Sequence, residues 1–343
     1  MHYLLSVSFI GWGASGPAFG AEAWLIAFRV TRLDGMKVLV TDPVDKLLLG
    51  ILEKHGLQVD YRPGVPREEL LKIIGDYDIL VVRSRTKVDR EVIDRGEKLK
   101  VIARAGVGLD NIDVQHAIEK GIKVVNAPGA AAQSVAELTI GLLIAAARFF
   151  KAHIVSLERR EWSKGRWTGV ELSGKTLGVI GFGRIGYRVA KIARGLGMRV
   201  LAYDVVDASD RAREIGAEFT RDLDVVLRES DAITLHVPLT KETYHLIDRD
   251  ALEKMKDGVI IVNTSRGPVI DTKALLEYLE SGKVFAAALD VLEHEPPKEE
   301  WEWRLVHHPR VIVTPHIGAE TREAKRRVAE ETAYAILEAL GMR

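Results

Sequence analysis

Three short stretches near the end of the chain carry side chains that could perform acid–base chemistry. They are "NTSRGPVID", "LDVLEHEPP" and "VTPHIG", and each contributes one reactive candidate: Arg266, Glu295 and His316. A guanidinium can hold a substrate carboxylate in a bidentate pair. An imidazole can take a proton from a hydroxyl group or return it, and a carboxylate on its far nitrogen would orient it and raise its pKa. The set fits the oxidation of an alcohol that lies next to a carboxylate.

Each of these residues also has an ordinary explanation. A histidine in a loop after a strand is more often solvated than catalytic, and arginine and glutamate are usually surface charges. We interpret His294, His307 and His308 in that way. Each of the three stretches follows an apolar strand pattern. Open α/β sheets bind their ligands at the carboxyl ends of the strands.

The stretch "TLGVIGFGRIGYRVA" predicts a dinucleotide-binding turn. Gly181, Gly183 and Gly186 have G-x-G-x-x-G spacing between an apolar strand pattern and a helical pattern. Such glycines permit a tight turn, the approach of a pyrophosphate to backbone N–H groups, and close packing of helix and strand. The next strand ends at Asp204, which suits the ribose hydroxyls of NAD and would repel the 2′-phosphate of NADP. We therefore predict NAD as the cofactor, and hydride transfer as the reaction beside it.

Two series of strands and helices must position these residues. The strands of the first series are "KVLVTD", "QVDY", "DILVVRS", "KVIARAG" and "IKVVNAP". The second series begins at Lys175, with "TLGVIG", "RVLAYD", "DAITLHVP", "GVIIVNTS", "FAAALDV" and "RVIVTPH". Strands that are apolar throughout suit parallel sheets covered on both faces, and alternation with helices implies right-handed βαβ units. We predict an α/β protein with two doubly wound parallel-sheet lobes.

The segment between the two series, residues 129–162, predicts one long helix. Ser134 and Glu137 have the spacing of a capping box, and apolar positions run nearly all round. This pattern indicates a buried connector or an oligomer surface. A last helix, at about 320–340, has no strand after it and could fold back onto the first lobe. We therefore predict a Rossmann NAD-binding domain (131–318) inserted into a flavodoxin-like substrate domain (36–130 and 319–343).

Composition narrows the possible partners. The 49 basic and 49 acidic side chains cancel, so charge gives no reason to expect binding to nucleic acid or to a membrane. The absence of cysteine excludes disulfides, thiolate metal sites and cysteine nucleophiles, and we expect no metal. Few Asn and Gln residues, together with 29% charged residues, are typical of a heat-adapted cytoplasmic protein.

Residues 1–35 differ from the rest of the chain. They are apolar and rich in Gly and Ala, with no Lys or Arg before Arg29. A signal peptide would need a positive start, and the apolar run is too short and too broken by Gly and Pro to span a membrane. Because Met36 opens a strand-then-helix pattern, we expect an upstream extension or a misassigned start. A structured extension is the alternative.

The motifs "VIGFGRIG", "LHVPLT", "NTSRGPVID", "LDVLEHEPP" and "TPHIGA", in this order, resemble the D-isomer-specific 2-hydroxyacid dehydrogenases from about Met36 to the end of the chain. The resemblance implies that Arg266 binds the substrate carboxylate, that Glu295 supports His316, and that His316 is the acid and base. It also implies a discontinuous first lobe and a homodimer formed through the NAD domains, with a tetramer as the alternative.

The same resemblance implies a set of cofactor contacts. Arg184 and Ile185 would hold the pyrophosphate through backbone N–H groups, and Asp290 would meet the carboxamide. The full set that we predict to bind NAD is Gly181, Gly183, Arg184, Ile185, Gly186, Asp204, Val237, Pro238, Thr264, Ser265, Arg266, Asp290, His316 and Gly318.

The first lobe offers two features for the substrate. "AGVG" supplies Gly-flanked backbone N–H groups that could form a nest for a carboxylate, and Arg83 adds a fixed cation. Two anionic ends suit 3-phosphoglycerate, and this part of the chain most resembles the 3-phosphoglycerate dehydrogenases of serine biosynthesis. Lys164 or Arg166 could reach the phosphate from a partner subunit. The residues that we predict to bind substrate are Arg83, Ser84, Arg104, Gly106, Val107, Gly108 and Arg266.

Two alternatives remain. Many members of the family continue into a C-terminal regulatory domain, whereas this sequence stops at Arg343, so we expect a short form. Short relatives reduce glyoxylate or hydroxypyruvate, and such a reductase is the first alternative. A nucleotide-sensing binding protein without turnover is the second. The complete set of Arg266, Glu295 and His316 argues against the second.

Overall fold

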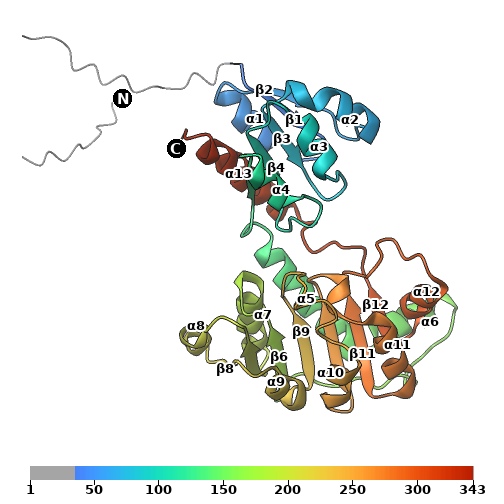
Figure 1. The fold of residues 1–343 in the computed structure, drawn as a ribbon. Coiled ribbons are helices and arrows are strands. Elements are labelled where there is room, and N and C mark those ends of the chain that lie inside the picture. The colour runs from blue at the N-terminus through green and yellow to red at the C-terminus, as the bar shows by residue number, and fades with distance from the viewer. Residues whose placement is uncertain (1–34, 343) are drawn as a thin grey trace, which may run out of the picture. The chain divides into compact units, whose positions relative to one another are not determined.

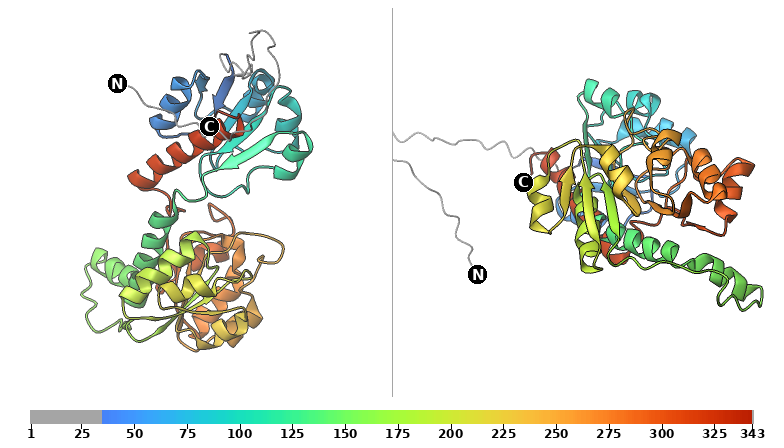
Figure 2. Two further views of the ribbon diagram at one scale, coloured as in Figure 1. Left: turned by 90° about the vertical axis from the view of Figure 1, so that its left-hand side faces the viewer. Right: turned by 90° about the horizontal axis from the view of Figure 1, so that it is seen from below.

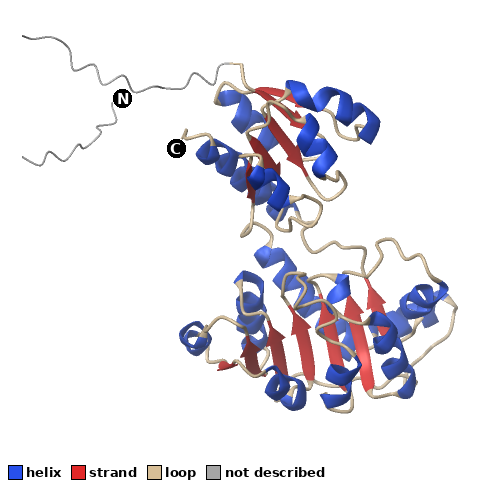
Figure 3. Ribbon diagram, in the orientation of Figure 1, coloured by secondary structure: helices blue, strands red, loops and turns tan. Residues whose placement is uncertain are grey.

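The computed structural model describes residues 35–342, and its strands form two parallel β-sheets (Figure 1). One sheet has five strands and the other has seven, and helices flank each sheet (Figure 3). This arrangement confirms the predicted α/β class with two parallel-sheet lobes. The expectation for the N-terminal extension lies outside the described residues, apart from Gly35.

The five-stranded sheet has the order β2-β1-β3-β4-β5, which is the flavodoxin-like order. Its central strand β3 is fully buried, as expected for a strand covered on both faces. Its elements are β1 (Lys37–Val40), α1 (Lys46–Lys54), β2 (Gln58–Tyr61), α2 (Arg67–Ile73), η1 (Ile74–Asp76), β3 (Ile79–Val82), α3 (Arg90–Arg95), β4 (Val101–Arg104), α4 (Val114–Glu119) and β5 (Lys123–Asn126).

The last helix of the chain, α13 (Arg322–Ala339), packs against α1, β4 and β5 of this same sheet (Figure 1). The Nζ atom of Lys123 donates to the carbonyl oxygen of Ala339 at 2.6 Å. The helix therefore returns to a sheet whose strands come about two hundred residues earlier. The sequence predicts this return, because no strand follows the last helix. The residue boundaries predicted for the two domains stay a prediction.

The seven-stranded sheet has the order β12-β11-β10-β9-β6-β7-β8. Six of its strands follow the Rossmann order, and β12 adds a seventh at one edge. The sequence predicted six strands and missed β8, whose three residues are too few to show a pattern. The strands are β6 (Thr176–Ile180), β7 (Arg199–Tyr203), β8 (Glu218–Thr220), β9 (Ala232–Leu235), β10 (Val259–Asn263), β11 (Val284–Leu289) and β12 (Val311–Val313).

Both faces of this sheet are buried under helices, which explains why its strands are apolar throughout. Leu177 and Val179 of β6 pack in a core with α5 and α7, whereas Ile180 packs in a second core with α9, α10 and α11. The helices are α5 (Ala132–Ala147), α6 (Phe150–Glu158), α7 (Arg184–Gly195), α8 (Ser209–Glu214), α9 (Leu223–Glu229), α10 (Arg249–Lys254), α11 (Thr272–Ser281) and α12 (Glu300–His307), with the short η2 (Gly267–Val269).

The prediction of one long helix over residues 129–162 is wrong, because the helix breaks at Phe149. The helices α5 and α6 meet at a bend of 67°, and Phe149 has a left-handed backbone with φ 51°. Its buried ring lies 4.7 Å from that of Phe285. The carbonyl oxygen of Ala147 accepts from the N–H of Val170 at 2.9 Å, so a distant segment takes a bond that a continuous helix would use.

The predicted capping box is also wrong. Helix α5 begins at Ala132, so Ser134 lies inside it and its hydroxyl oxygen is 2.7 Å from that of Thr321. Among the described residues, no single helix is long and apolar enough to cross a membrane. The bent pair α5–α6 meets the length and composition requirement only when its two halves are joined.

Candidate active site

The glycine turn has the shape that a pyrophosphate needs. Gly181 follows β6 with φ 91°, and a Cβ atom there would lie 2.6 Å from the carbonyl oxygen of His236. A Cβ atom on Gly186 would lie 2.0 Å from the carbonyl oxygen of Gly181. A Cβ atom on Gly183, the N-cap of α7, would meet nothing within 4 Å, so the backbone is open there. The residues present therefore fit a dinucleotide whose phosphates lie at the N-terminus of α7, beside Arg184 and Ile185.

The carboxylate of Asp204 lies directly beside this turn. It accepts from the N–H of Phe182 at 2.8 Å and from the N–H of Val206 at 3.1 Å. The two bonds fix the orientation of the carboxylate and leave acceptor capacity for ribose hydroxyls. Asp204, predicted to accept from the ribose hydroxyls, is thus hydrogen-bonded to the predicted dinucleotide-binding turn.

Arg211 is a residue at the turn that the sequence reasoning missed. Its guanidinium lies 5.1 Å from the ring centre of Tyr187, and one nitrogen lies 3.4 Å from the carbonyl oxygen of Gly183. The side chain reaches the turn from α8, an element that the sequence pattern did not predict. No local signal could have found it, because its position depends on how α8 packs.

Several of the residues predicted to bind NAD follow β9 and β10. Val237 is adjacent to the glycine turn, and the carbonyl oxygen of Pro238 accepts from the hydroxyl of Thr243 at 2.6 Å. The hydroxyl oxygen of Thr264 is 2.8 Å from that of Thr139 on α5. Ser265 donates its N–H and its hydroxyl to the side chain of Asn263, at 2.9 and 2.8 Å. These bonds fix the backbone of the loop that carries Arg266.

Asp290 anchors the loop that carries His316. Its buried carboxylate accepts from the hydroxyl of Thr314 at 2.6 Å, from the N–H of Ile317 at 2.8 Å and from the N–H of Gly318 at 2.9 Å. Its carbonyl oxygen accepts from the N–H of His316 at 2.8 Å. The predicted contact of Asp290 with the carboxamide of the cofactor stays a prediction.

The structure brings Glu295 and His316 together. The Nδ1 atom of His316 lies 2.8 Å from Oε2 of Glu295, and Oε1 of Glu295 accepts from the N–H of Leu292 at 3.2 Å. The bond to Glu295 raises the pKa of His316 above its usual value, although burial opposes the shift. Burial opposes ionisation of Glu295 and is the largest single influence on it. The bond and charge of His316, the N–H of Leu292 and the charge of Arg266 together outweigh burial and lower the pKa of the carboxyl.

The backbone of His316 is left-handed, with φ 54°. Non-glycine residues rarely adopt this region, and such strain concentrates at functional sites. The bonds to Asp290 hold the residue there. With Nδ1 bonded to Glu295, the Nε2 atom remains for a substrate hydroxyl.

The guanidinium of Arg266 contacts a carboxylate from the first lobe. Its Nε and Nη2 atoms lie 2.9 and 2.8 Å from one oxygen of Asp110, and Nη1 donates to the carbonyl oxygen of Ser265 at 2.7 Å. A Cβ atom on Gly108 would lie 1.8 Å from Nη2 of Arg266. Glycine at 108 therefore allows the guanidinium to lie against the loop that follows β4.

Arg104, at the end of β4, is a partly buried cation close to two others. Burial, and then the charges of Arg83 and Arg266, lower the pKa of Arg104 to about 10. Its Nε atom is buried and has no hydrogen-bond partner among residues 35–342. Gly106 has φ 152°, which favours glycine, and a Cβ atom there would lie 1.4 Å from Nη1 of Arg104, so a larger residue would displace that guanidinium. An anion beside this loop would relieve the repulsion between the three guanidinium groups.

The predicted nest of backbone N–H groups is smaller than expected. The N–H of Ala105 donates to the carbonyl oxygen of Val82, and that of Gly106 donates to the carbonyl oxygen of Arg104, both at 2.8 Å. Within the described part of the chain, the N–H groups of Val107 and Gly108 have no such partner. Two donors are therefore present for a carboxylate, where the sequence suggested a longer run.

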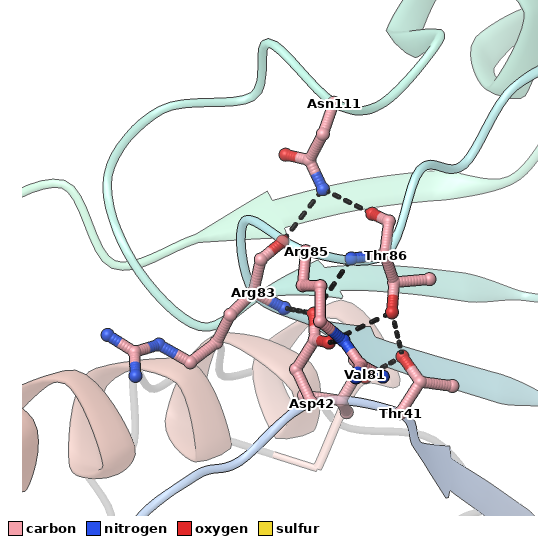
Figure 4. A network of polar contacts seen from close by, with 7 residues as sticks. All are labelled: Thr41, Asp42, Val81, Arg83, Arg85, Thr86 and Asn111. Carbon is pink, nitrogen blue, oxygen red and sulfur yellow. Dashed lines mark hydrogen bonds and ion pairs between the residues drawn. The ribbon is translucent and has the colours of Figure 1, made fainter. Parts of the chain in front are cut away.

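A buried carboxylate holds the loop that carries Arg83 (Figure 4). Asp42 accepts from the backbone N–H of Arg83 at 2.6 Å and from the hydroxyl of Thr86 at 3.0 Å. The side-chain amide of Asn111 donates to the carbonyl oxygens of Arg83 and Thr86, at 2.7 and 2.6 Å. Figure 4 shows the guanidinium of Arg83 extending away from this network. Ser84, next along the loop, is exposed.

Comparison with known proteins gives the family. The NAD-binding domain of the D-isomer-specific 2-hydroxyacid dehydrogenases matches residues 140–318. A hydroxypyruvate reductase of Thermotoga maritima is 52% identical over 89% of this chain and 99% of its own. A D-3-phosphoglycerate dehydrogenase of Methanocaldococcus jannaschii is 53% identical over 85% of this chain, which spans 55% of that relative. The structure of D-lactate dehydrogenase from Aquifex aeolicus, complexed with NAD and lactic acid, has a TM-score of 0.78 at 34% identity, covering 89% of this chain and 96% of that one.

The chain therefore belongs to the D-isomer-specific 2-hydroxyacid dehydrogenase family. It is an NAD-dependent oxidoreductase, and NAD is its cofactor. The predicted family, enzyme class and cofactor are confirmed. The roles of the individual site residues are proposals.

Proposed function

We propose that the chain oxidises 3-phospho-D-glycerate to 3-phosphooxypyruvate, the first step of serine biosynthesis. The observation that carries the chemistry is the 2.8 Å contact between His316 and Glu295, beside the guanidinium of Arg266. NAD, when bound, supplies the hydride acceptor. The protein must supply a base, a carboxylate-binding group and an environment that excludes water.

His316 serves as the base. Its Nε2 atom takes the proton of the C2 hydroxyl while Glu295 stabilises the imidazolium that forms. In the reverse direction the imidazolium returns the proton to the oxygen of the 2-oxo acid. Arg266 pairs with the C1 carboxylate and fixes C2 for the reaction.

The first lobe supports a substrate with two anionic ends. The N–H groups of Val107 and Gly108, with the partly buried charge of Arg104, suit the C1 carboxylate. Arg83, on a loop held by Asp42, suits a phosphate at C3. The relatives named D-3-phosphoglycerate dehydrogenase support this choice.

A second candidate is the reduction of hydroxypyruvate or glyoxylate. The observation in its favour is that Arg83 is already paired: its Nη2 atom lies 3.1 Å from an oxygen of Glu320. A substrate without phosphate would leave that pair intact. The Thermotoga maritima relative, which this chain matches over nearly its whole length, is named hydroxypyruvate reductase.

The test is a substrate panel with NAD and NADP, followed by the absorbance of the reduced cofactor. We expect NAD-dependent oxidation of 3-phosphoglycerate. In an Arg83→Ala variant, we expect a larger loss of kcat/KM for 3-phosphoglycerate than for D-glycerate. Turnover of hydroxypyruvate and glyoxylate without turnover of 3-phosphoglycerate would select the second candidate. Equal losses on both hydroxy acids in the variant would remove the reason for proposing a phosphate.

We also propose that the enzyme is a homodimer formed through the α5–α6 region, with a tetramer as the alternative. Figure 2, in its right-hand view, shows the end of this helix pair extending away from the sheet. Large apolar side chains are exposed on and after α6: Phe150, Ile154, Leu157 and Trp162. A second copy would cover them and could bring Lys164 or Arg166 to the substrate phosphate. Light scattering should show a dimer that Ile154→Asp weakens, whereas Ile118→Asp, also exposed but on α4, should leave the dimer unchanged.

The cellular setting is a further proposal. We place the enzyme in the cytoplasm of a heat-adapted cell, a setting that its few Asn and Gln residues and its 29% charged residues suit. Retention of activity after incubation at high temperature would support heat adaptation, and rapid loss at moderate temperature would contradict it.

A further inference from the structure

A small pocket lies at the carboxyl edge of the five-stranded sheet. Its volume is about 170 Å³, and it is lined by the turn after β1, by Arg83 and Ala105 after β3 and β4, and by Lys325 and Val328 of α13. The strand order changes direction between β1 and β3, and open α/β sheets bind ligands at such a switch point. The pocket is therefore placed where this lobe would receive the end of the substrate remote from C1.

One carboxylate bridges the two cations of this pocket. The Nη2 atom of Arg83 lies 3.1 Å from Oε1 of Glu320, and the Nζ atom of Lys325 lies 2.5 Å from Oε2 of the same residue. The bond to Lys325, and then the bond to Arg83, lower the pKa of Glu320 below its usual value. Glu320 is therefore charged at neutral pH and uses one oxygen for each cation.

We propose that Glu320 selects substrates by charge: its carboxylate competes with a phosphate on the substrate for Arg83 and Lys325. The inference rests on the proposed function, because it assumes that the remote end of the substrate enters this pocket. A phosphate dianion must displace the carboxylate of Glu320 from both cations or bind beside a like charge. A neutral hydroxymethyl group meets no such competition. Glu320 thus lowers the ratio of kcat/KM for a phosphorylated substrate to that for its unphosphorylated counterpart. This holds whichever of the two substrates the enzyme uses better.

The sequence position of Glu320 makes this effect separable from catalysis. Glu320 lies four residues after His316 and is bonded to residues of the first lobe and of α13, not to His316, Glu295 or Arg266. Its backbone N–H donates to the carbonyl oxygen of Ile317 at 2.9 Å, a bond that does not depend on the side chain. A Glu320→Gln variant keeps the shape and this turn and removes only the charge.

The experiment compares 3-phosphoglycerate with D-glycerate, using NAD and one fixed ionic strength. In Glu320→Gln, we expect the ratio of kcat/KM for 3-phosphoglycerate to that for D-glycerate to rise roughly three- to tenfold, the size expected for losing two partly exposed ion pairs. The change should appear in KM for the phosphorylated substrate. Glu323→Gln, an exposed residue on the first turn of the same helix, removes an equal charge and should leave the ratio unchanged.

A binding measurement keeps the proposal testable without turnover. Inorganic phosphate should stabilise Glu320→Gln against thermal unfolding more than it stabilises the unaltered protein, and Glu320→Ala should behave like Glu320→Gln. A ratio that stays constant, falls, or rises equally in Glu323→Gln would overturn the proposal, as would equal stabilisation by phosphate. If neither hydroxy acid is oxidised by the unaltered enzyme, the proposed function fails, and the phosphate measurement alone decides on Glu320.

Discussion

Arg266 and Asp110 form an ion pair in which two guanidinium nitrogens lie 2.9 and 2.8 Å from one carboxylate oxygen. The two residues are 156 positions apart in the sequence. The guanidinium proposed to receive the substrate carboxylate therefore already holds a carboxylate of the protein. A substrate must replace Asp110 on Arg266, and the strength of this pair should affect substrate affinity.

We predict that Asp110→Asn lowers KM for the hydroxy acid. The side chain of Asp110 is half exposed, and an ion pair of this kind corresponds to roughly a two- to fivefold change in affinity. Steady-state kinetics should show a lower KM with little change in kcat. Asp76→Asn, which loses an exposed ion pair to Lys98 far from the site, is the matched control. An increase in KM would show that Asp110 assists binding and does not compete with it.

Asp204 should determine the choice between NAD and NADP. Replacing it by Asn keeps the size of the side chain and removes the charge that would receive ribose hydroxyls and repel a 2′-phosphate. We expect KM for NAD to rise roughly tenfold or more, as is typical for loss of a charge-assisted bond. The ratio of kcat/KM for NAD to that for NADP should fall. Asp207→Asn, on the exposed loop nearby, should change neither value. An unchanged cofactor preference would remove Asp204 from the site.

Lys151 should matter for stability and not for catalysis. Its half-buried ammonium donates to the carbonyl oxygens of Val306, His308 and Val311, at 2.5, 3.0 and 2.8 Å, and so ties α6 to the end of α12 and to β12. Lys151→Met leaves these acceptors without a donor and should cost about 1–3 kcal/mol of unfolding free energy. Calorimetry should show a lower Tm with KM unchanged. Lys191→Met, exposed on α7, should leave Tm within error of the unaltered protein.

The bond between Glu295 and His316 should set the pH dependence. Oxidation needs the neutral imidazole, so its rate should rise with pH through the raised pKa of His316, while reduction should fall over the same range. In Glu295→Gln that pKa returns toward its ordinary value, and both transitions should move to lower pH. His294→Gln, which loses its partner Glu302 outside the site, is the control. If the pH–rate profiles of Glu295→Gln match those of the unaltered enzyme, Glu295 does not act through His316.

The stability linked to this pair has a definite sign. Because the fold raises the pKa of His316, its contribution is fully present below the pKa of the unfolded chain and is lost as pH rises through the folded value. Because the fold lowers the pKa of Glu295, its contribution is lost as pH falls through that value. The pair should therefore stabilise the protein most at pH values between the lowered pKa of Glu295 and the raised pKa of His316.

Much of the fold could be predicted from the strand patterns. Strands such as β3 and β6 are apolar throughout because helices cover both of their faces, and the pattern is visible without any structure. The break between α5 and α6 could not be predicted, because the N–H of Val170, which takes the carbonyl oxygen of Ala147 at the break, belongs to a segment outside the helix. A contact made by a distant segment leaves no trace in the local helix pattern.

The site also contains residues that could be placed from the sequence and residues that could not. His316 and Glu295 could be placed together because each follows a neighbouring strand of one sheet, β12 and β11. The partners of Arg266 and Arg83, namely Asp110 and Glu320, could not be placed, because each pair joins segments that are 156 and 237 residues apart. The sequence identified the cations, and the structure identified what they hold.

We propose that His316 carries the proton in the oxidation of a 2-hydroxy acid. The most direct measurement is kcat of His316→Asn with saturating NAD and 3-phosphoglycerate, together with the Kd for NAD. We predict a fall in kcat of roughly 10²- to 10⁴-fold, the size of general acid–base catalysis, with the Kd for NAD nearly unchanged. A kcat close to that of the unaltered enzyme would show that His316 is not the acid and base.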